Sequence, residues 1–240
     1  MEDALHAIMI EALAPYQGAL RLGESASLAV LSAEDQQDHF LHPEEEQALP
    51  PRACMRKRTE WVLGRAAACR ALRELGGDPW PVLRGDHGEP VWPEGIGGSI
   101  THCWPWTAAL LIKAGKRFAI GIDLENLERA ALVDFSSVIC TAAELDWTRG
   151  GEFQRRLAMI FSAKEAVYKG LHPFCRRYID FKEVELAWLP RPRSFRVAFV
   201  GGLKTEFAAL GECKVLSRRI NGLVFSCLVH DTERPARLAA

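Results

Sequence analysis

Two short segments carry charged side chains at spacings that suit phosphate chemistry. The first is GIDLE, residues 121–125. In a strand, Asp123 and Glu125 would point to one face of the sheet, because side chains alternate between faces. Carboxylate oxygens gathered on one face are the ligands that a hard divalent cation such as Mg²⁺ accepts. The segment therefore predicts a metal site, although a solvated strand face would show the same spacing.

The second segment is FSAKEAVYKG, residues 161–170, which lies within an amphipathic helical pattern. Lys164 falls inside the apolar stripe of this helix, and Glu165 and Lys169 lie beside it, one turn apart. Glu165 could supply a third carboxylate to the metal, while the two lysines could neutralise phosphate oxygens. The alternatives are an i,i+4 ion pair between Glu165 and Lys169 and a Lys164 whose aliphatic part lies on the core.

A third candidate is GGSITHC, residues 97–103. His102 precedes an apolar strand, where its ring could donate a hydrogen bond to a phosphate oxygen. Gly97 and Gly98 would allow the backbone to approach a ligand closely. A structural histidine and ordinary turn glycines would explain the same pattern.

The sequence also predicts some of the helices and strands that must position these residues. A helix is expected from about Ala53 to Leu75, ended by Gly76-Gly77. Arg58 and Arg65 share one face of it, about 10 Å apart along the axis. Its core face is marked by Trp61, Ala68, Leu72 and Leu75.

The rest of the chain reads as loop, strands and helices. Residues 76–98 are expected to be mostly irregular, because they are rich in Gly and Pro. Residues 106–114 and 117–125 predict a hairpin joined by Gly115-Lys116. Thr141 and Glu144 form a capping box that starts a helix. Two further hairpins are expected, over 181–200 and over 213–229, the second with Asn221-Gly222 as its turn. The fold class is α+β.

Composition excludes several classes of protein. The chain has 240 residues, 48% hydrophobic and 25% charged, as in an ordinary soluble globular protein. A net charge of −1 argues against a nucleic-acid-binding protein. Seven scattered cysteines without a CxxC pair argue against a disulfide framework and favour the reducing cytoplasm. The start of the chain is unlike a signal peptide, and no apolar run is long enough to span a membrane.

Taken together and in this order, the segments resemble the Sfp-type 4′-phosphopantetheinyl transferases, in the branch of enterobactin synthetase component D and related mycobacterial enzymes. The resemblance covers roughly Pro43 to Phe181. Its blocks are RKRTEWVLGRAAACRAL, RGDHGEPVWPEGIGGSITHC, GIDLE and FSAKEAVYKG. It implies transfer of 4′-phosphopantetheine from coenzyme A to a carrier-protein serine, with release of 3′,5′-ADP.

The resemblance also implies the fold. Members of the family consist of two α+β halves with antiparallel sheets, related by a pseudo-twofold axis, with coenzyme A in the cleft between them. Here the halves would be residues 1–114 and 115–240. No repeat is visible in the sequence itself.

For the reaction centre, the resemblance implies three metal ligands, Asp123, Glu125 and Glu165, which would hold Mg²⁺ or Mn²⁺ against the diphosphate of coenzyme A. Lys169 would assist the leaving ADP, with Lys164 beside it. Glu165, directly or through a metal-bound water, would be the base that deprotonates the serine.

The resemblance implies further contacts with coenzyme A. His102 matches a histidine that contacts a phosphate. Lys57 and Arg58 compete for one position, which the family register assigns to Lys57 and helix geometry assigns to Arg58. His87 stands where some relatives have a lysine. The remaining expected contacts are Arg65, Arg84, Ser99 and Thr101.

The expected partners are coenzyme A and apo carrier proteins with an acidic docking helix, serving siderophore, polyketide or nonribosomal peptide synthesis. The basic turn HPFCRRYID, residues 172–180, is a candidate docking surface, with Arg176 and Arg177 beside Phe174. A monomer is expected. Two alternatives remain: a catalytically silent sensor of coenzyme A, and another Mg²⁺-dependent phosphoryl transferase, which lacks support because the chain has no P-loop.

Overall fold

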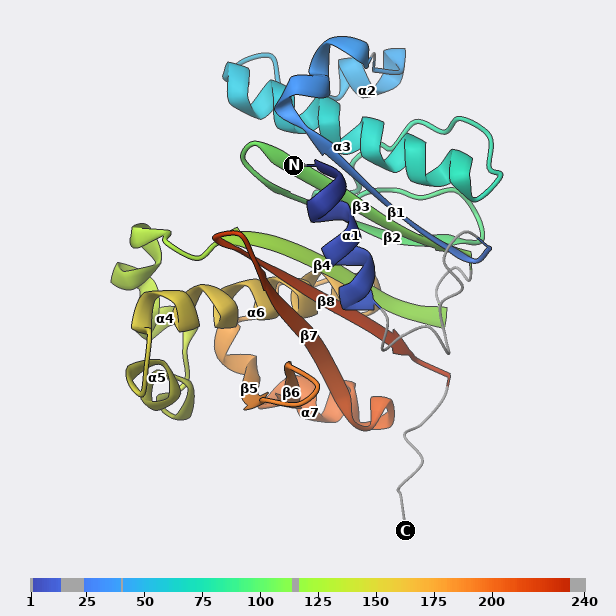
Figure 1. Ribbon diagram of the computed structural model, residues 1–240. Helices are drawn as coiled ribbons and strands as arrows, with labels where there is room; N and C mark the ends of the chain where they lie inside the picture. Colours follow the sequence, from blue (N-terminus) through green and yellow to red (C-terminus); the bar gives the residue numbers. More distant parts are fainter. Residues whose placement is uncertain (1, 14–23, 40, 114–116, 234–240) are drawn as a thin grey trace. The chain divides into compact units, whose positions relative to one another are not determined.

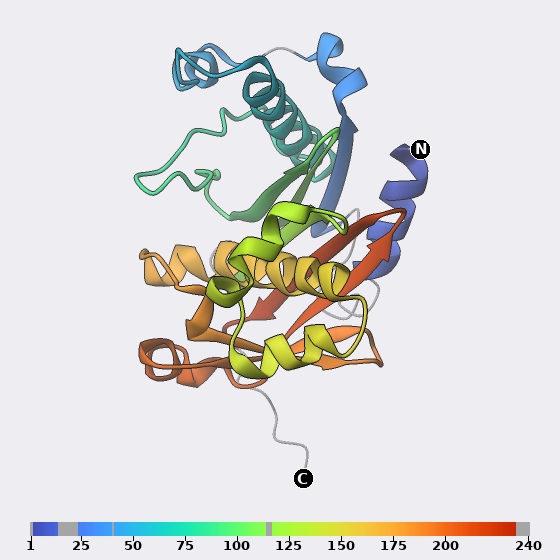
Figure 2. The same cartoon turned by 90° about the vertical axis from the view of Figure 1, so that its left-hand side faces the viewer.

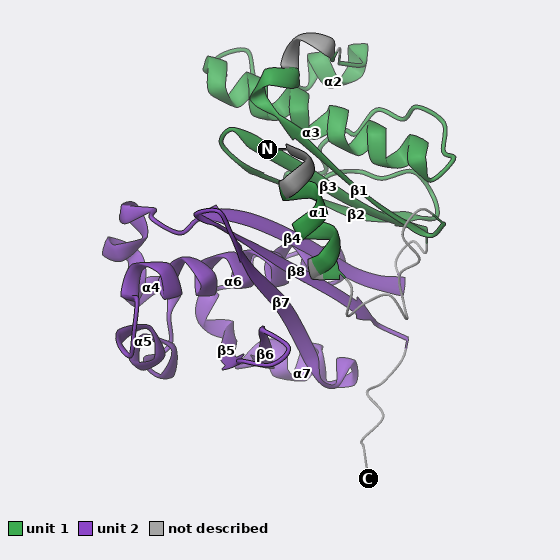
Figure 3. Cartoon of the chain, in the orientation of Figure 1, with its two compact units in different colours: residues 1–116 green, residues 117–240 purple. Residues whose placement is uncertain are grey.

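The protein is described from a computed structural model that covers residues 2–13, 24–39, 41–113 and 117–233. The chain divides into two compact units, residues 1–116 and residues 117–240 (Figure 3). The sequence predicted a boundary between residues 114 and 115, which lies outside the described residues. Each unit is described by itself.

Unit 1 is a small antiparallel sheet packed against one long helix (Figure 1). Its sheet has the order β1-β3-β2, and α3 packs on β1 and β3 through a core that includes Leu63, Ala67 and Leu111. Its elements are α1 (Glu2–Leu13), β1 (Ala26–Ser32), η2 (Ala33–Asp38), α2 (Pro43–Gln47), α3 (Met55–Glu74), β2 (Ile96–Cys103) and β3 (Trp106–Lys113).

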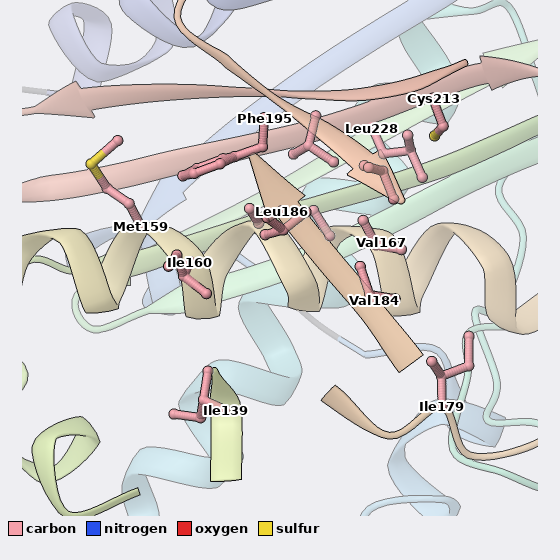
Figure 4. Close-up of a cluster of buried hydrophobic side chains, with 14 of the residues drawn as sticks. Ile139, Met159, Ile160, Val167, Ile179, Val184, Leu186, Phe195, Cys213 and Leu228 are labelled. Atoms are coloured by element: carbon pink, nitrogen blue, oxygen red, sulfur yellow. The ribbon is translucent and has the colours of Figure 1, made fainter. Parts of the chain in front are cut away.

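Unit 2 is a larger antiparallel sheet of order β4-β8-β7-β6-β5, with the 23-residue helix α6 lying across it (Figure 2). Apolar side chains of α6, such as Ile160 and Val167, meet Leu186, Phe195 and Leu228 of the sheet in one core (Figure 4). Its elements are β4 (Phe118–Asn126), η4 (Ala130–Phe135), α4 (Ser136–Ile139), α5 (Ala142–Arg149), α6 (Phe153–Cys175), η5 (Phe181–Glu183), β5 (Val184–Leu189), β6 (Ser194–Phe199), α7 (Gly202–Glu206), η6 (Ala208–Leu210), β7 (Cys213–Ile220) and β8 (Leu223–Asp231).

The two units share one connectivity. In unit 1 the chain runs β1, α3, β2, β3, and the strands lie in the order β1-β3-β2. In unit 2 it runs β4, α6, β7, β8, and the corresponding strands lie in the order β4-β8-β7, with β5 and β6 added at the far edge. The expected α+β class with antiparallel sheets is therefore confirmed. The twofold relation between the halves stays a prediction.

Several local predictions are confirmed. Gly76 has a φ of +73° at the end of α3, and Gly77 N–H donates to the Leu72 carbonyl. The Thr141 capping box starts α5. Asn221 and Gly222, with φ of 45° and 84°, form the turn between β7 and β8, and β5 pairs with β6 as expected.

Two predictions for the first half of the chain are wrong. The apolar run 106–114 does not form a hairpin with 117–125, because β3 pairs with β1 and β2 whereas β4 pairs with β8. The true hairpin partner, β2, begins within the segment expected to be irregular. Trp61 also lies outside the core of α3 and packs beneath Arg65 instead. Gly115-Lys116 lies outside the described residues.

None of the described helices combines the length and the apolar character that crossing a bilayer requires.

The contact between α6 and β4 is unusually close, because glycine occupies both sides of it. A Cβ atom at Gly121 would lie 1.8 Å from the Ala166 carbonyl oxygen, and one at Gly170 would lie 3.3 Å from the Gly121 nitrogen. The obstacles at Gly121 are backbone atoms, which cannot rotate away, whereas the nearest atom to a Cβ at Gly170 is Leu228 Cδ2 at 2.7 Å. Glycine at these two positions therefore sets the distance between the strand and the helix.

Gly121→Ala is expected to destabilise the protein by about 1–3 kcal/mol or more, since the added methyl must push α6 away from β4. Chemical denaturation measures this change. Gly202→Ala is the matched control, because its methyl would meet nothing closer than 4.0 Å. Equal stabilities of the two variants would contradict this description of the contact.

Candidate functional site

Asp123 and Glu125 lie on the face of β4 that packs against α6, as the alternation of the strand predicted. Asp123 is buried, and Lys169 Nζ on α6 donates to its Oδ1 at 2.7 Å and to the Ile122 carbonyl at 3.1 Å. The strand and the helix thus bring an acid from GIDLE and a lysine from FSAKEAVYKG into direct contact.

Glu125 is held by two groups close to it in the chain. Arg129, half exposed, forms an ion pair with Glu125 Oε2. The Asn126 backbone N–H donates to Oε1 at 2.7 Å. Glu125 is buried. Arg129, at the edge of the site, compensates the negative charge of its carboxylate.

Glu165, on α6, lies close enough to both of these acids for their negative charges to affect its pKa. Burial raises the pKa of its carboxyl group, and the charges of Asp123 and Glu125 raise it further, while Lys169 and Arg129 act in the opposite direction. The net shift is upward. Folded Glu165 therefore takes up a proton more readily than a glutamate in water does.

This donor set fits a hard divalent cation in its chemistry. All three predicted ligands offer carboxylate oxygens, and their mutual repulsion would be relieved by a positive ion. Within the described residues, however, no group of three or more His, Cys, Asp or Glu side chains already has the spacing of a metal site. Metal binding would require the carboxylates to leave Lys169 and Arg129.

A pocket of about 220 Å³ adjoins Glu165 in unit 2. Its wall combines Tyr168 on α6 with Tyr178, Ile179 and Phe181 from the following loop and turn. An apolar chain attached to a group bound at Glu165 could occupy this space.

Lys164 corrects a prediction. Its side chain is only 1% exposed, and Nζ donates to Glu144 Oε2, to the Ile139 carbonyl and to the Phe181 carbonyl at 2.7–2.8 Å. An ammonium group has three N–H donors, so none remains for a phosphate oxygen. The structure contradicts the alternative that Lys164 lays its stem on the core and extends its ammonium group to water. The expected contact with coenzyme A stays a prediction, and it would require Lys164 to leave these partners.

Glu144 completes this buried pair. Its Oε1 accepts from Leu186 N–H at 2.7 Å, and its Oε2 accepts from Thr141 N–H in the capping box. Burial lowers the pKa of Lys164, while Glu144 acts in the opposite direction. Lys164 and Glu144 therefore join α6 to the start of α5 and to β5. Their role is structural.

In unit 1, a basic cluster forms around Trp61. The Arg65 guanidinium lies 3.3 Å from the centre of the Trp61 ring, and Arg84 lies 5.9 Å from the same ring. Arg65 Nε donates to the Val82 carbonyl. Burial lowers the pKa of Arg65 to about 10, with a further contribution from the positive charge of Arg84. Two of the predicted phosphate contacts thus lie on one indole.

The ring of Trp61 is itself fixed by α2. Its Nε1–H donates to the Glu45 carbonyl at 3.1 Å, and the Glu45 carboxylate accepts from Val82 N–H at 2.8 Å. The loop that carries Arg84 is therefore tied to α2 and α3 through buried Glu45.

The other predicted cations of unit 1 are more exposed. Arg58 Nη2 pairs with Glu46 at 3.3 Å, whereas the Lys57 side chain is exposed and makes no hydrogen bond or ion pair with the described residues. Lys57 is thus the one of the two that could bind an anion without breaking an ion pair. His87 is exposed in the loop 85–89, where its backbone N–H donates to Glu89.

The segment SITH lies on β2 and so presents its side chains on two faces. His102 points toward α3, where its Nε2 lies 3.5 Å from Glu60. Ser99 and Thr101 are buried and, by alternation, lie on the other face. One surface of β2 therefore cannot present all three predicted contacts.

The basic turn 172–180 is only partly available. The Arg177 guanidinium forms two hydrogen bonds of 2.9 Å with Glu183 and also pairs with Glu206, and this raises its pKa. Arg176, Phe174 and Tyr178 are exposed.

Sequence reasoning missed two residues of the site. Arg129 lies four residues after Glu125, a spacing that could have indicated the ion pair had the strand been expected to end between them. Tyr178 carried no signal of its own, because its place in the pocket depends on how the loop after α6 folds back.

Two family models match the chain, one in each unit. The family model described as the 4′-phosphopantetheinyl transferase N-terminal domain matches residues 44–112, within unit 1. The model of the 4′-phosphopantetheinyl transferase superfamily matches residues 119–210, within unit 2.

Three curated relatives are similar in sequence. The 4′-phosphopantetheinyl transferase Svp of Streptomyces mobaraensis is 34% identical over 172 residues, which are 70% of this chain and 69% of Svp. PptT of Mycobacterium tuberculosis, also named a 4′-phosphopantetheinyl transferase, is 32% identical over 60% of this chain and 64% of PptT. Enterobactin synthase component D of Salmonella typhimurium is 38% identical over 48% of each chain. The chain thus spans between about half and just over two thirds of these relatives.

Lys164→Met is expected to destabilise the protein by about 3–5 kcal/mol, because it leaves the buried Glu144 carboxylate without its cation. Denaturant unfolding measures the loss. Lys182→Met, at an exposed position, is the control.

The double variant Lys164→Met/Glu144→Gln is expected to recover part of that stability, since the unpaired charge is removed. If Lys164→Met were as stable as the wild type, the structural role of this lysine would be wrong.

Proposed function

This chain belongs to the 4′-phosphopantetheinyl transferase superfamily, and we propose that it transfers 4′-phosphopantetheine from coenzyme A to a serine hydroxyl of acyl, peptidyl or aryl carrier proteins. The reaction requires Mg²⁺ and releases 3′,5′-ADP. The observation that carries the proposal is the meeting of Asp123, Glu125 and Glu165 with Lys169 at the crossing of β4 and α6.

Asp123, Glu125 and Glu165 would hold the metal. Bound Mg²⁺ would neutralise charge on the diphosphate of coenzyme A. Lys169 now donates to Asp123, and Arg129 to Glu125. Once these carboxylates have another positive partner, both side chains can turn to phosphate oxygens. Lys169 then neutralises the charge that develops on the leaving ADP.

Glu165 is the proposed base. Its carboxylate lines the pocket from α6, and a general base must lie within reach of the proton that it takes. The pocket beside it, with Tyr168 and Tyr178 in the wall, can take the pantetheine chain next to the reacting phosphate. Glu165 then accepts the serine proton directly or through a water molecule.

The basic cluster of unit 1 is proposed to bind a phosphate of coenzyme A. Arg65 and Arg84 both lie near the Trp61 ring and repel one another, and an anion would relieve that repulsion. Lys57 and His102 are the further contacts we propose, because both are exposed: Lys57 lies on α3 with Arg65, and His102 lies 3.5 Å from Glu60 of the same helix.

The carrier protein needs a surface near the acids of unit 2. Exposed apolar side chains gather just after Glu125, at Val133, Phe135 and Val138 on η4 and α4. Exposed clusters of this kind often mark protein–protein contacts. This segment and the loop 172–180, which offers Arg176 and Phe174, are the two docking surfaces that we propose. The proposed carriers include those of secondary-metabolite pathways such as siderophore synthesis.

The experiment mixes the protein with MgCl₂, coenzyme A and an apo carrier protein and follows the intact mass of the carrier. We expect a gain of one phosphopantetheine group. Asp123→Ala is expected to lower the rate by about a hundredfold or more, because even residues behind metal ligands contribute 10- to 100-fold.

Glu212→Ala is the control, since this acid is exposed just before β7 and lies outside the carboxylate group and both proposed docking surfaces. Binding of coenzyme A without any mass gain would overturn the transferase and favour a silent sensor. Full activity of Asp123→Ala would overturn the proposed metal site.

A further inference from the structure

A second, larger pocket lies in unit 2, with a volume of about 460 Å³. It opens between α5, the beginning of α6, the turn that joins β5 to β6, and β7. The residues that give it its chemistry are Trp147, Trp188, Met159, Arg156, Arg193 and Arg219. None of these belongs to the carboxylate group or to the pocket beside Glu165.

The apolar wall is aromatic and fixed in place. The rings of Trp147 and Trp188 lie 6.0 Å apart and are tilted by 40°. Fully buried Phe195 packs edge-on against both, at 5.5 Å and 4.9 Å. Because the core supports the two indoles from below, they present a preformed surface on which a flat ring can stack.

The polar wall is positive. The Arg156 guanidinium lies 4.9 Å from the Trp147 ring and donates to the Trp147 carbonyl. It passes over Gly151, where a Cβ atom would lie 2.5 Å from Cζ. Glycine at this position therefore leaves room for the arginine that holds Trp147.

The other two arginines differ in their partners. Arg219 donates to Met159 Sδ and pairs with Glu152, an acid that it shares with Arg155. Arg193 has a φ of 63°, and its guanidinium makes no hydrogen bond or ion pair with the described residues. Three arginines thus line one pocket, and no acid is among the residues that line it.

We propose that this pocket binds a small aromatic anion, that is, a flat ring carrying a carboxylate or a similar acidic group. The ring stacks on Trp147 and Trp188, and the acid pairs with Arg193 and Arg219. The volume lies within the range of small-molecule sites. Guanidinium groups are suited to bidentate binding of a planar carboxylate. The inference concerns a site separate from the proposed reaction centre and does not depend on the proposed activity.

The test uses 2-naphthoate as the aromatic acid and 2-naphthamide as its uncharged analogue, titrated into the full chain by calorimetry. We expect saturable binding of 2-naphthoate and affinity for the amide lower by about tenfold or more, because a hydrogen bond to a charged group is lost. Arg193→Asn is expected to weaken 2-naphthoate by a similar factor. Asn tolerates the positive φ at this position.

Two controls locate the binding. Arg196→Gln, an exposed arginine on β6 that does not line the pocket, is expected to bind as the wild type does. The indole N–H signals of Trp147 and Trp188, assigned by single Trp→Phe variants, are expected to shift on binding whether or not coenzyme A is present.

The proposal would be overturned if 2-naphthoate did not bind saturably, or if the acid and the amide bound equally well. It would also be overturned if Arg193→Asn bound 2-naphthoate as tightly as the wild type, or if coenzyme A displaced 2-naphthoate. Arg193→Lys keeps the positive charge and is expected to restore part of the affinity. Failure of that variant alone to bind would overturn the assignment of a charge-pairing role to this position.

Discussion

The main constraint on unit 2 is the burial of several carboxylates where α6 crosses β4. Asp123 and Glu125 are buried on the strand, and Glu165 faces them from the helix, so like charges lie close together in a poorly hydrated place. Gly121 and Gly170 let the strand and the helix that carry these acids approach closely. The result is a group that needs positive charge. Lys169 and Arg129 supply it here, and a divalent cation would supply it more completely.

Lys164 and Lys169, five residues apart on α6, differ in exposure, and we assign a structural role to the first and a ligand-binding role to the second. Lys164 and its partner Glu144 are 1% and 0% exposed, and every N–H of the ammonium is used within unit 2. Lys169 and Asp123 are 26% and 10% exposed, so this pair borders water and can exchange partners. The first pair fixes α5 and β5 against α6. The second remains able to respond to a ligand.

Features that depend on residues close together in the chain could be predicted from the sequence. Features that depend on contacts between distant residues could not. The capping box at Thr141, the Asn221-Gly222 turn and the alternation of Asp123 and Glu125 are local properties, and all were predicted. The pairing of β4 with β8 joins residues about a hundred positions apart, so the apparent hairpin with β3 was wrong. Lys164 looked like a ligand-binding cation because Glu144 lies 20 residues earlier on another helix. The shared connectivity of the two units appears only once the strands are paired.

The most direct test of the central claim is thermal unfolding of the wild type and Glu165→Gln, with and without Mg²⁺, across pH. The raised pKa means that folded Glu165 holds its proton to a higher pH than the unfolded chain does, so the wild type loses stability as pH rises through that range. Without Mg²⁺ at neutral pH, Glu165→Gln is expected to unfold at a higher temperature than the wild type, and this difference should vanish as pH falls. Mg²⁺ is expected to stabilise the wild type and not the variant. A less stable Glu165→Gln, or equal stabilisation of both proteins by Mg²⁺, would contradict the account.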